Sequence, residues 1–164
     1  MRMKRLLLTA AVVAAISCLA APASRAQSQA LLGPDVGLWV DLGKIDLGLI
    51  AEFLITPEVS IQPGVHFVID AYPNTTLLIF DGNVHYNFAL RGQTFSPYVR
   101  GGIGIWHSSY SSGSISSSGT DVHLNIGGGL TFNTRSDMQP FVGLSIAFVG
   151  GSDVKLHGGL KWAI

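Results

Sequence analysis

His107, Ser109 and Asp121 are the residues of this sequence whose types and spacing come nearest to hydrolytic chemistry. A histidine can take the proton of a serine hydroxyl while a carboxylate orients the imidazole ring. The His–Ser pair, however, lies at the edge of the serine-rich tract SSYSSGSISSSG, where such spacings arise easily. A triad also needs a geometry that spacing alone does not supply. The sequence therefore predicts no catalytic residues.

Charged and imidazole side chains fall on the polar faces of alternating segments. The charged ones are Glu52, Asp81, Arg100 and Lys161, and the histidines are His66, His85, His123 and His157. Acids and bases confined in a narrow interior should pair, because an unpaired buried charge costs several kcal/mol. We expect a structural lumen charge network, with a gated ion path as the alternative. A metal site would need several histidines at one depth, and we predict no metal and no cofactor.

The elements that must position these side chains are β-strands, because apolar and polar residues alternate along most of the chain. Leu144 and Ile146 alternate with Gly143 and Ser145, a period of two that puts the two sets on opposite faces of a strand. Eight such segments are predicted at residues 36–42, 46–55, 59–70, 76–88, 95–107, 120–132, 139–149 and 154–164. Residues 77–80 are apolar on both faces and predict a rim or a partly dry interior.

The first 26 residues have the layout of an export signal, with a charged start, an apolar run and small residues before a cleavage site at Gln27. Residues 27–164 would then form one domain. They contain six Lys and Arg against ten Asp and Glu, a net charge of −4, which indicates no basic nucleic-acid-binding face. Cys18, a weaker candidate for lipidation, is the only cysteine, so the mature part has no disulfide or thiolate site.

Composition indicates which face of the strands points outward. The sequence is 48% hydrophobic and only 12% charged, whereas a soluble surface carries about 25 to 35% charged residues. The polar faces hold glycines such as Gly102, Gly127 and Gly159, as expected where side chains converge inside a narrow barrel. We therefore predict that the apolar residues face lipid, among them Val142, Leu144, Ile146, Leu160 and Trp162. A soluble ligand-binding barrel with an apolar interior is the rival.

The blocks LITPEVSIQPGV, FDGNVHYNF, SPYVRGGIGIW, LNIGGGLTF and QPFVGLSIAF follow one another along the chain and precede an alternating last strand. In order and spacing they resemble the eight-stranded outer-membrane β-barrel family of Gram-negative bacteria, which includes the OmpA transmembrane domain, OmpX and the opacity proteins. The resemblance covers residues 27–164. It implies an all-β, eight-stranded antiparallel up-and-down transmembrane β-barrel in the cell outer membrane.

The same resemblance implies partners. The barrel would contact outer-membrane lipid and lipopolysaccharide, and the barrel-assembly machinery would act on it during insertion. That machinery would read the alternate residues Leu160, Trp162 and Ile164 of the last strand, where Ile164 stands in place of the aromatic residue common at that end.

The connections predict an orientation and a contact surface. With both termini periplasmic, the links after the second, fourth and sixth segments are inner turns, and residues 108–119 form the longest outer loop. Loops on a rigid scaffold often carry function, so Ser108, Tyr110 and Ser118 are the candidate contact residues. The predicted function is structural or surface-interactive (adhesin-like) and non-enzymatic, with an extracellular partner that the sequence does not name. The alternatives are a narrow small-solute channel and, because some barrels of this size are lipid A deacylases with a His-x-Ser pair, a lipid A-modifying enzyme.

Overall fold

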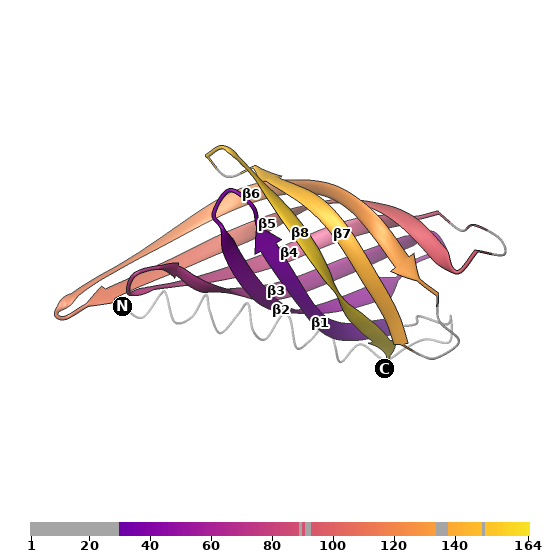
Figure 1. Cartoon of the computed structure of the whole chain (residues 1–164), viewed down its shortest axis with the longest axis horizontal. Coiled ribbons are helices and arrows are strands. Elements are labelled where there is room, and N and C mark those ends of the chain that lie inside the picture. The colour runs from indigo at the N-terminus through magenta and orange to yellow at the C-terminus, as the bar shows by residue number, and fades with distance from the viewer. Residues whose placement is uncertain (1–29, 89, 91–92, 134–137, 149) are drawn as a thin grey trace.

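The computed structural model describes residues 30–164 except 89, 91–92, 134–137 and 149. The predicted signal peptide, residues 1–26, and its cleavage site lie outside the described residues. Eight strands close into one barrel in which sequence neighbours lie side by side (Figure 1). They are β1 (Ala30–Trp39), β2 (Lys44–Leu54), β3 (Val59–Tyr72), β4 (Thr75–Asn87), β5 (Phe95–Ser112), β6 (Ile115–Phe132), β7 (Met138–Phe148) and β8 (Ser152–Ala163). Among the described residues, no helix is long and apolar enough to cross a membrane.

The ring is closed by the ladder between the first and last strands. Every ladder is antiparallel. Leu31 of β1 lies opposite Ala163 of β8, and the Ile164 N–H donates to the Ala30 carbonyl at 3.0 Å. Closure gives the backbone groups of both end strands a partner, which hydrocarbon cannot offer. The predicted all-β, eight-stranded antiparallel up-and-down barrel is confirmed.

The pleat of β7 and β8 shows which face is outside. Val142 and Leu144 are 48% and 46% exposed, whereas Ser145, Lys155 and His157 on the opposite face are buried. The other residues predicted to face lipid share the outer face of the same two strands: Ile146, Leu160 and Trp162. Apolar side chains therefore cover the outside of the barrel, and most of the buried side chains inside it are polar or charged. The rival, a soluble barrel with an apolar interior, is wrong for this chain.

The first strand differs from its predicted range of 36–42. It begins at Ala30 and ends at Trp39, and residues 40–43 form the turn to β2. The prediction failed because Gly33 and Pro34 look like strand breakers. In the barrel, Pro34 is tolerated at an outward position where β1 meets β8, and Gly33 allows the backbone of Leu160 to approach closely.

The serine-rich tract also differs from the prediction, because residues 108–119 form a hairpin rather than a loop. β5 continues to Ser112 and β6 starts at Ile115, so that only Gly113 and Ser114 make the turn. Gly113 has φ +58°, as the first central position of a type II′ hairpin turn requires. The sequence did not indicate strands here because strand residues outside the lipid need no alternation of apolar and polar side chains.

Candidate functional site

The lumen is lined by inward-facing residues of all eight strands. These positions hold buried polar and charged side chains: Asp35, Asp46, Glu52, Ser60, Gln62, His66, Asn83, His85, Arg100, His123, Asn125, Thr131, Ser145, Lys155, His157 and Lys161. Eight strands leave an interior just wide enough for side chains to fill. The chemistry of the lumen therefore depends on how these groups pair.

One group of paired side chains, here called the aspartate cluster, consists of Asp35, Asp46, Asp81, His66, His123, His157 and Lys155. Asp46 stands at its centre and is fully buried. The Lys155 ammonium lies 3.0 Å from Asp46 Oδ2, and His66 Nδ1 lies 3.2 Å from Asp46 Oδ1. The indole N–H of Trp39 donates to the same carboxylate at 2.6 Å. Three different strands besides its own thus hold one carboxylate.

The two other acids of the cluster lie beside histidines. His123 Nε2 lies 3.0 Å from Asp81 Oδ1, and His66 Nε2 lies 3.6 Å from Asp81 Oδ2. Asp35 lies 3.6 Å from His157 Nδ1. His66 therefore bridges Asp46 and Asp81 through its two ring nitrogens, which links β2, β3 and β4 across the lumen.

A second pair lies nearer the end of the barrel where β1 begins and β8 ends. Lys161 Nζ donates to Glu52 Oε2 at 2.6 Å, and the Ser60 hydroxyl donates to Glu52 Oε1 at 2.5 Å. Both charged side chains are almost completely buried. Elsewhere, Arg100 Nη2 donates to the Ser145 hydroxyl at 2.9 Å. Each charge-assisted hydrogen bond fixes one strand against another across the barrel.

The four predicted lumen charges all lie inside the barrel but do not form one network. Glu52 pairs with Lys161, Asp81 pairs with histidines, and Arg100 bonds a serine. Three buried charged residues of the described chain were missed: Asp35, Asp46 and Lys155. The alternation rule could have found Asp46, which shares the face of Glu52, and Lys155, which shares the face of Lys161. Asp35 lay outside the predicted strand.

Apolar side chains fill the barrel at the end that carries the β1–β2 and β5–β6 turns. The buried members are Trp39, Val68, Ala71, Leu77, Ile79 and Ala147, with Leu42 and Trp106 packed against them. The rings of Trp39 and Trp106 meet edge to face, with centroids 5.2 Å apart. Leu77 and Ile79 point inward, as the doubly apolar run 77–80 predicted. The lumen is thus apolar at this end and charged below it.

A glycine makes room for the aspartate cluster. A Cβ added to Gly104 of β5 would collide with the His123 ring and the Asp81 carboxylate. Glycine at this position therefore lets the two side chains meet beside the strand. Packing against the aspartate cluster therefore explains why a glycine stands at this inward position, as the sequence predicted for the polar faces of the strands.

The hydrolytic triad considered from the sequence is not assembled. His107 Nδ1 lies 3.0 Å from the hydroxyl of Thr120, its register partner on β6. Asp121 lies opposite Trp106 instead, so its side chain points to the other face of the hairpin. Ser109 faces Ser118 across the ladder. Within the described residues, no carboxylate therefore meets His107. Among the described residues, no group of His, Cys, Asp and Glu is arranged to hold a metal ion.

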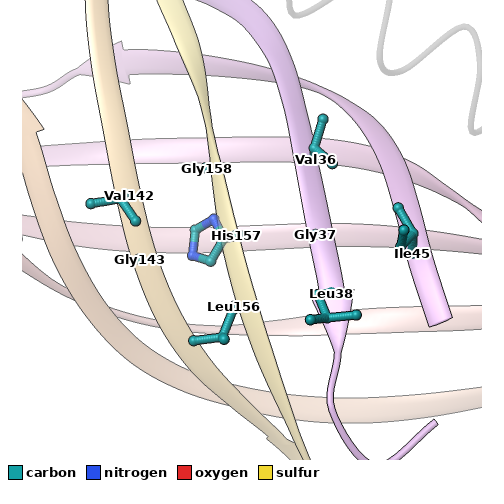
Figure 2. Close-up of a pocket in the computed structure, with 9 residues that line it drawn as sticks. All are labelled: Val36, Gly37, Leu38, Ile45, Val142, Gly143, Leu156, His157 and Gly158. Atoms are coloured by element: carbon teal, nitrogen blue, oxygen red, sulfur yellow. The ribbon is translucent and has the colours of Figure 1, made fainter. Parts of the chain in front are cut away.

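The outer surface has a shallow apolar groove at the seam of β7, β8 and β1 (Figure 2). Gly158 lies between Val142 of β7 and Val36 of β1 in the two ladders. Gly158 has no side chain, so the surface is hollowed at this position. Leu38 and Leu156 line the groove beside it. Its apolar lining matches the lipid-facing surface around it.

The β5–β6 hairpin is the most prominent feature outside the barrel, and it extends far beyond the neighbouring turns (Figure 1). β5 and β6 pair without interruption from Phe95 opposite Phe132 to Ser112 opposite Ile115. Residues 115–122 are all exposed. The candidate contact residues Ser108, Tyr110 and Ser118 lie on this hairpin, and Tyr110 is exposed.

Comparison with known proteins identifies the fold. The N-terminal β-barrel domain of Pseudomonas aeruginosa OprF is similar with a TM-score of 0.72 and 14% sequence identity, over 84% of this chain and 98% of that one. The fold is that of the eight-stranded outer-membrane barrels. Ail, the attachment invasion locus protein of Yersinia pestis, matches with a TM-score of 0.60 and 14% identity, over 84% of this chain and 97% of that one. The outer membrane enzyme PagL matches with a TM-score of 0.52 and 17% identity, over 82% and 99%.

Sequence comparisons add no family to this result. No protein-family model matches the chain, and no curated protein sequence does. The three structures share one barrel, yet one is called an attachment protein and another an enzyme. The fold thus leaves the activity to be argued from this chain's own residues.

Proposed function

We propose that this chain is a non-enzymatic protein of the cell outer membrane whose barrel is a rigid scaffold and whose β5–β6 hairpin contacts other molecules at the cell surface. The observation that carries the proposal is the contrast between a filled lumen and a long exposed hairpin. Buried ion pairs and a packed apolar end occupy the inside of the barrel, which supports a scaffold rather than a channel. The hairpin offers the accessible surface.

Orientation is part of the proposal. The two ends of the described chain, Ala30 and Ile164, meet at one end of the barrel, and the hairpin turn lies at the other (Figure 1). In outer-membrane barrels the short turns are periplasmic and the longer connections extracellular. We therefore place both termini in the periplasm and the hairpin outside. Attachment, which the name of the similar protein Ail describes, is consistent with a projecting surface element.

Orientation is tested by cysteine labelling, since the only natural cysteine, Cys18, lies in the predicted leader. The Ser116→Cys variant should react with a membrane-impermeant maleimide in intact cells. The matched control Pro57→Cys, in the β2–β3 turn, should react only after lysis. The opposite result would place the hairpin in the periplasm and overturn the proposed role.

The contact role is tested by crosslinking in living cells. A photoreactive phenylalanine analogue at Ser109 or Ser118 should give specific adducts, whereas the same analogue at Gly151 in the exposed β7–β8 turn serves as control. Adducts confined to the hairpin positions support the proposal. Identical adduct patterns at Gly151 and at the hairpin would contradict a hairpin-specific contact.

The channel alternative has its own test. The purified protein in planar lipid bilayers should give no discrete conductance steps, because Asp46, Lys155 and the apolar residues around Ile79 occupy the lumen. Regular steps from a correctly folded sample would support a channel instead.

A further inference from the structure

The two edges of the β5–β6 hairpin differ, because one is paired with a neighbouring strand and the other is not. The inference drawn from this difference rests on the proposed role of the hairpin as a contact element. On the β5 side, β4 continues the sheet up to Thr75 opposite Tyr110, and the Ser111 N–H donates to the Asn74 carbonyl at 3.0 Å. On the β6 side, the ladder with β7 begins only at Leu124, opposite Phe148. Within the described part of the chain, no strand lies beside residues 115–122 on that side.

The register shows which backbone groups this free edge presents. In an antiparallel ladder, alternate residues direct both backbone groups to opposite neighbours. The Asn133 N–H donates to the Thr94 carbonyl at 2.8 Å, so the odd-numbered residues of β6 bond to β5. The register stays continuous to the turn. The residues that direct N–H and C=O to the free edge are therefore Ser116, Ser118, Thr120 and Val122.

This edge lacks the features that usually protect an exposed strand. Natural edge strands are guarded by lysines, prolines, bulges or a covering segment. Residues 115–122 contain neither lysine nor proline, and their only charge is Asp121, whose backbone groups point to β5. The ladder with β5 has no bulge. Three of the four edge residues, Ser116, Ser118 and Thr120, carry small hydroxyl side chains, and the fourth is Val122, so an incoming backbone can approach closely.

We propose that the free edge of β6 binds an extended, uncharged polypeptide segment as an additional antiparallel strand. The segment would lie in line with β7 beyond Phe148. Its backbone would accept hydrogen bonds from the N–H groups of the four edge residues and donate hydrogen bonds to their carbonyl groups. Main-chain hydrogen bonds would supply the affinity, and the small edge side chains make recognition tolerant of sequence. A second copy in the same membrane presents its own β6 in the same direction, so the two could pair only in parallel. Parallel pairing is the weaker arrangement.

The variant Ser118→Pro tests this directly. Proline removes the N–H that points to the free edge and leaves the β5 ladder intact, since Ser118 is not bonded to β5; edge strands tolerate proline at such positions. Ser118→Ala is the matched control, because it removes the hydroxyl and keeps the backbone donor. Thr120→Pro repeats the test one edge position away. Heat-modifiable gel migration checks that each variant remains a folded barrel.

The probe is a fluorescent peptide of alternating threonine and valine with terminal lysines, added to the full protein in lipid nanodiscs and followed by anisotropy. Wild type and Ser118→Ala should bind it equally, and both proline variants should bind it about tenfold more weakly, the effect of losing one to two backbone hydrogen bonds. The same peptide methylated on alternate backbone nitrogens should not bind. Equal binding by wild type and the proline variants, equal binding of the methylated peptide, or no saturable binding at all would overturn the inference.

Two further outcomes separate this inference from the proposed function. If Ser118→Pro leaves the hairpin crosslinks in cells unchanged, the contact role stands and the edge is not its basis. Association of labelled wild-type copies with one another is measured in vesicles of the same lipids. If Ser118→Pro abolishes that association, the occupant is a second copy, and the polypeptide partner proposed here is wrong.

Discussion

Removing Lys161 should destabilise the barrel far more than removing both members of its ion pair. The Lys161 ammonium lies 2.6 Å from Glu52 Oε2, and both side chains are less than one tenth exposed. Lys161→Met leaves the Glu52 carboxylate buried with only the Ser60 hydroxyl as a partner. Breaking a buried pair in this way costs about 3 to 5 kcal/mol. Replacing both partners by apolar groups of similar volume is often neutral or even stabilising.

The assay is a double-mutant cycle of Lys161→Met, Glu52→Leu and the double variant. The free energy of unfolding is measured by urea titration in lipid vesicles, with tryptophan fluorescence and heat-modifiable gel migration as coincident probes. The double variant should recover most of the stability that Lys161→Met loses. The reasoning is refuted if Lys161→Met costs less than about 1 kcal/mol, the value of a solvent-exposed pair, or if the double variant is as unstable as the single one.

Three other perturbations have defined outcomes. Leu144→Arg, in the middle of β7 on the lipid-facing side, should cost about 2 to 4 kcal/mol in the same unfolding assay, and Leu144→Phe should not; tolerance of the arginine would place this face away from hydrocarbon. Gly104→Leu should prevent formation of the heat-modifiable barrel because its side chain collides with His123 and Asp81, whereas a folded Gly104→Leu protein would show that the cluster can rearrange. His107→Ala should leave the acyl number of lipid A unchanged in mass spectra of cells that express the protein, and a difference from wild type would reveal a deacylase.

The barrel could be predicted from the sequence because one physical rule governs the segment inside the membrane. Because lipid lies outside and packed polar groups lie inside, apolar and polar side chains must alternate along each strand, as Leu144 and Ser145 do. The rule needs no knowledge of partners. It therefore identified the strands and the outward face without reference to any contact between distant residues.

The same rule could not predict what lies outside the lipid or which side chains meet. Ser116 and Ser118 belong to a strand, but both of its faces meet water, so no alternation marks it. The pairing of Asp81 with His123 depends on the stagger between β4, β5 and β6, which sets the depth of each residue. A sequence shows on which face a charge lies, whereas the register shows its height in the barrel.

The ladder between β1 and β8 has a consequence for assembly. Seven ladders join neighbouring strands and can form as local hairpins, whereas this one brings together Leu31 and Ala163 from near the two ends of the described chain. Bringing distant residues together lowers the entropy of the chain before any favourable contact between them has formed. Completion of the ring should therefore be the late, slow event of folding. Until it occurs, the sheet is an open ribbon whose outermost strands can be captured by another chain, and substitutions that weaken β1 or β8 should prolong that vulnerable interval.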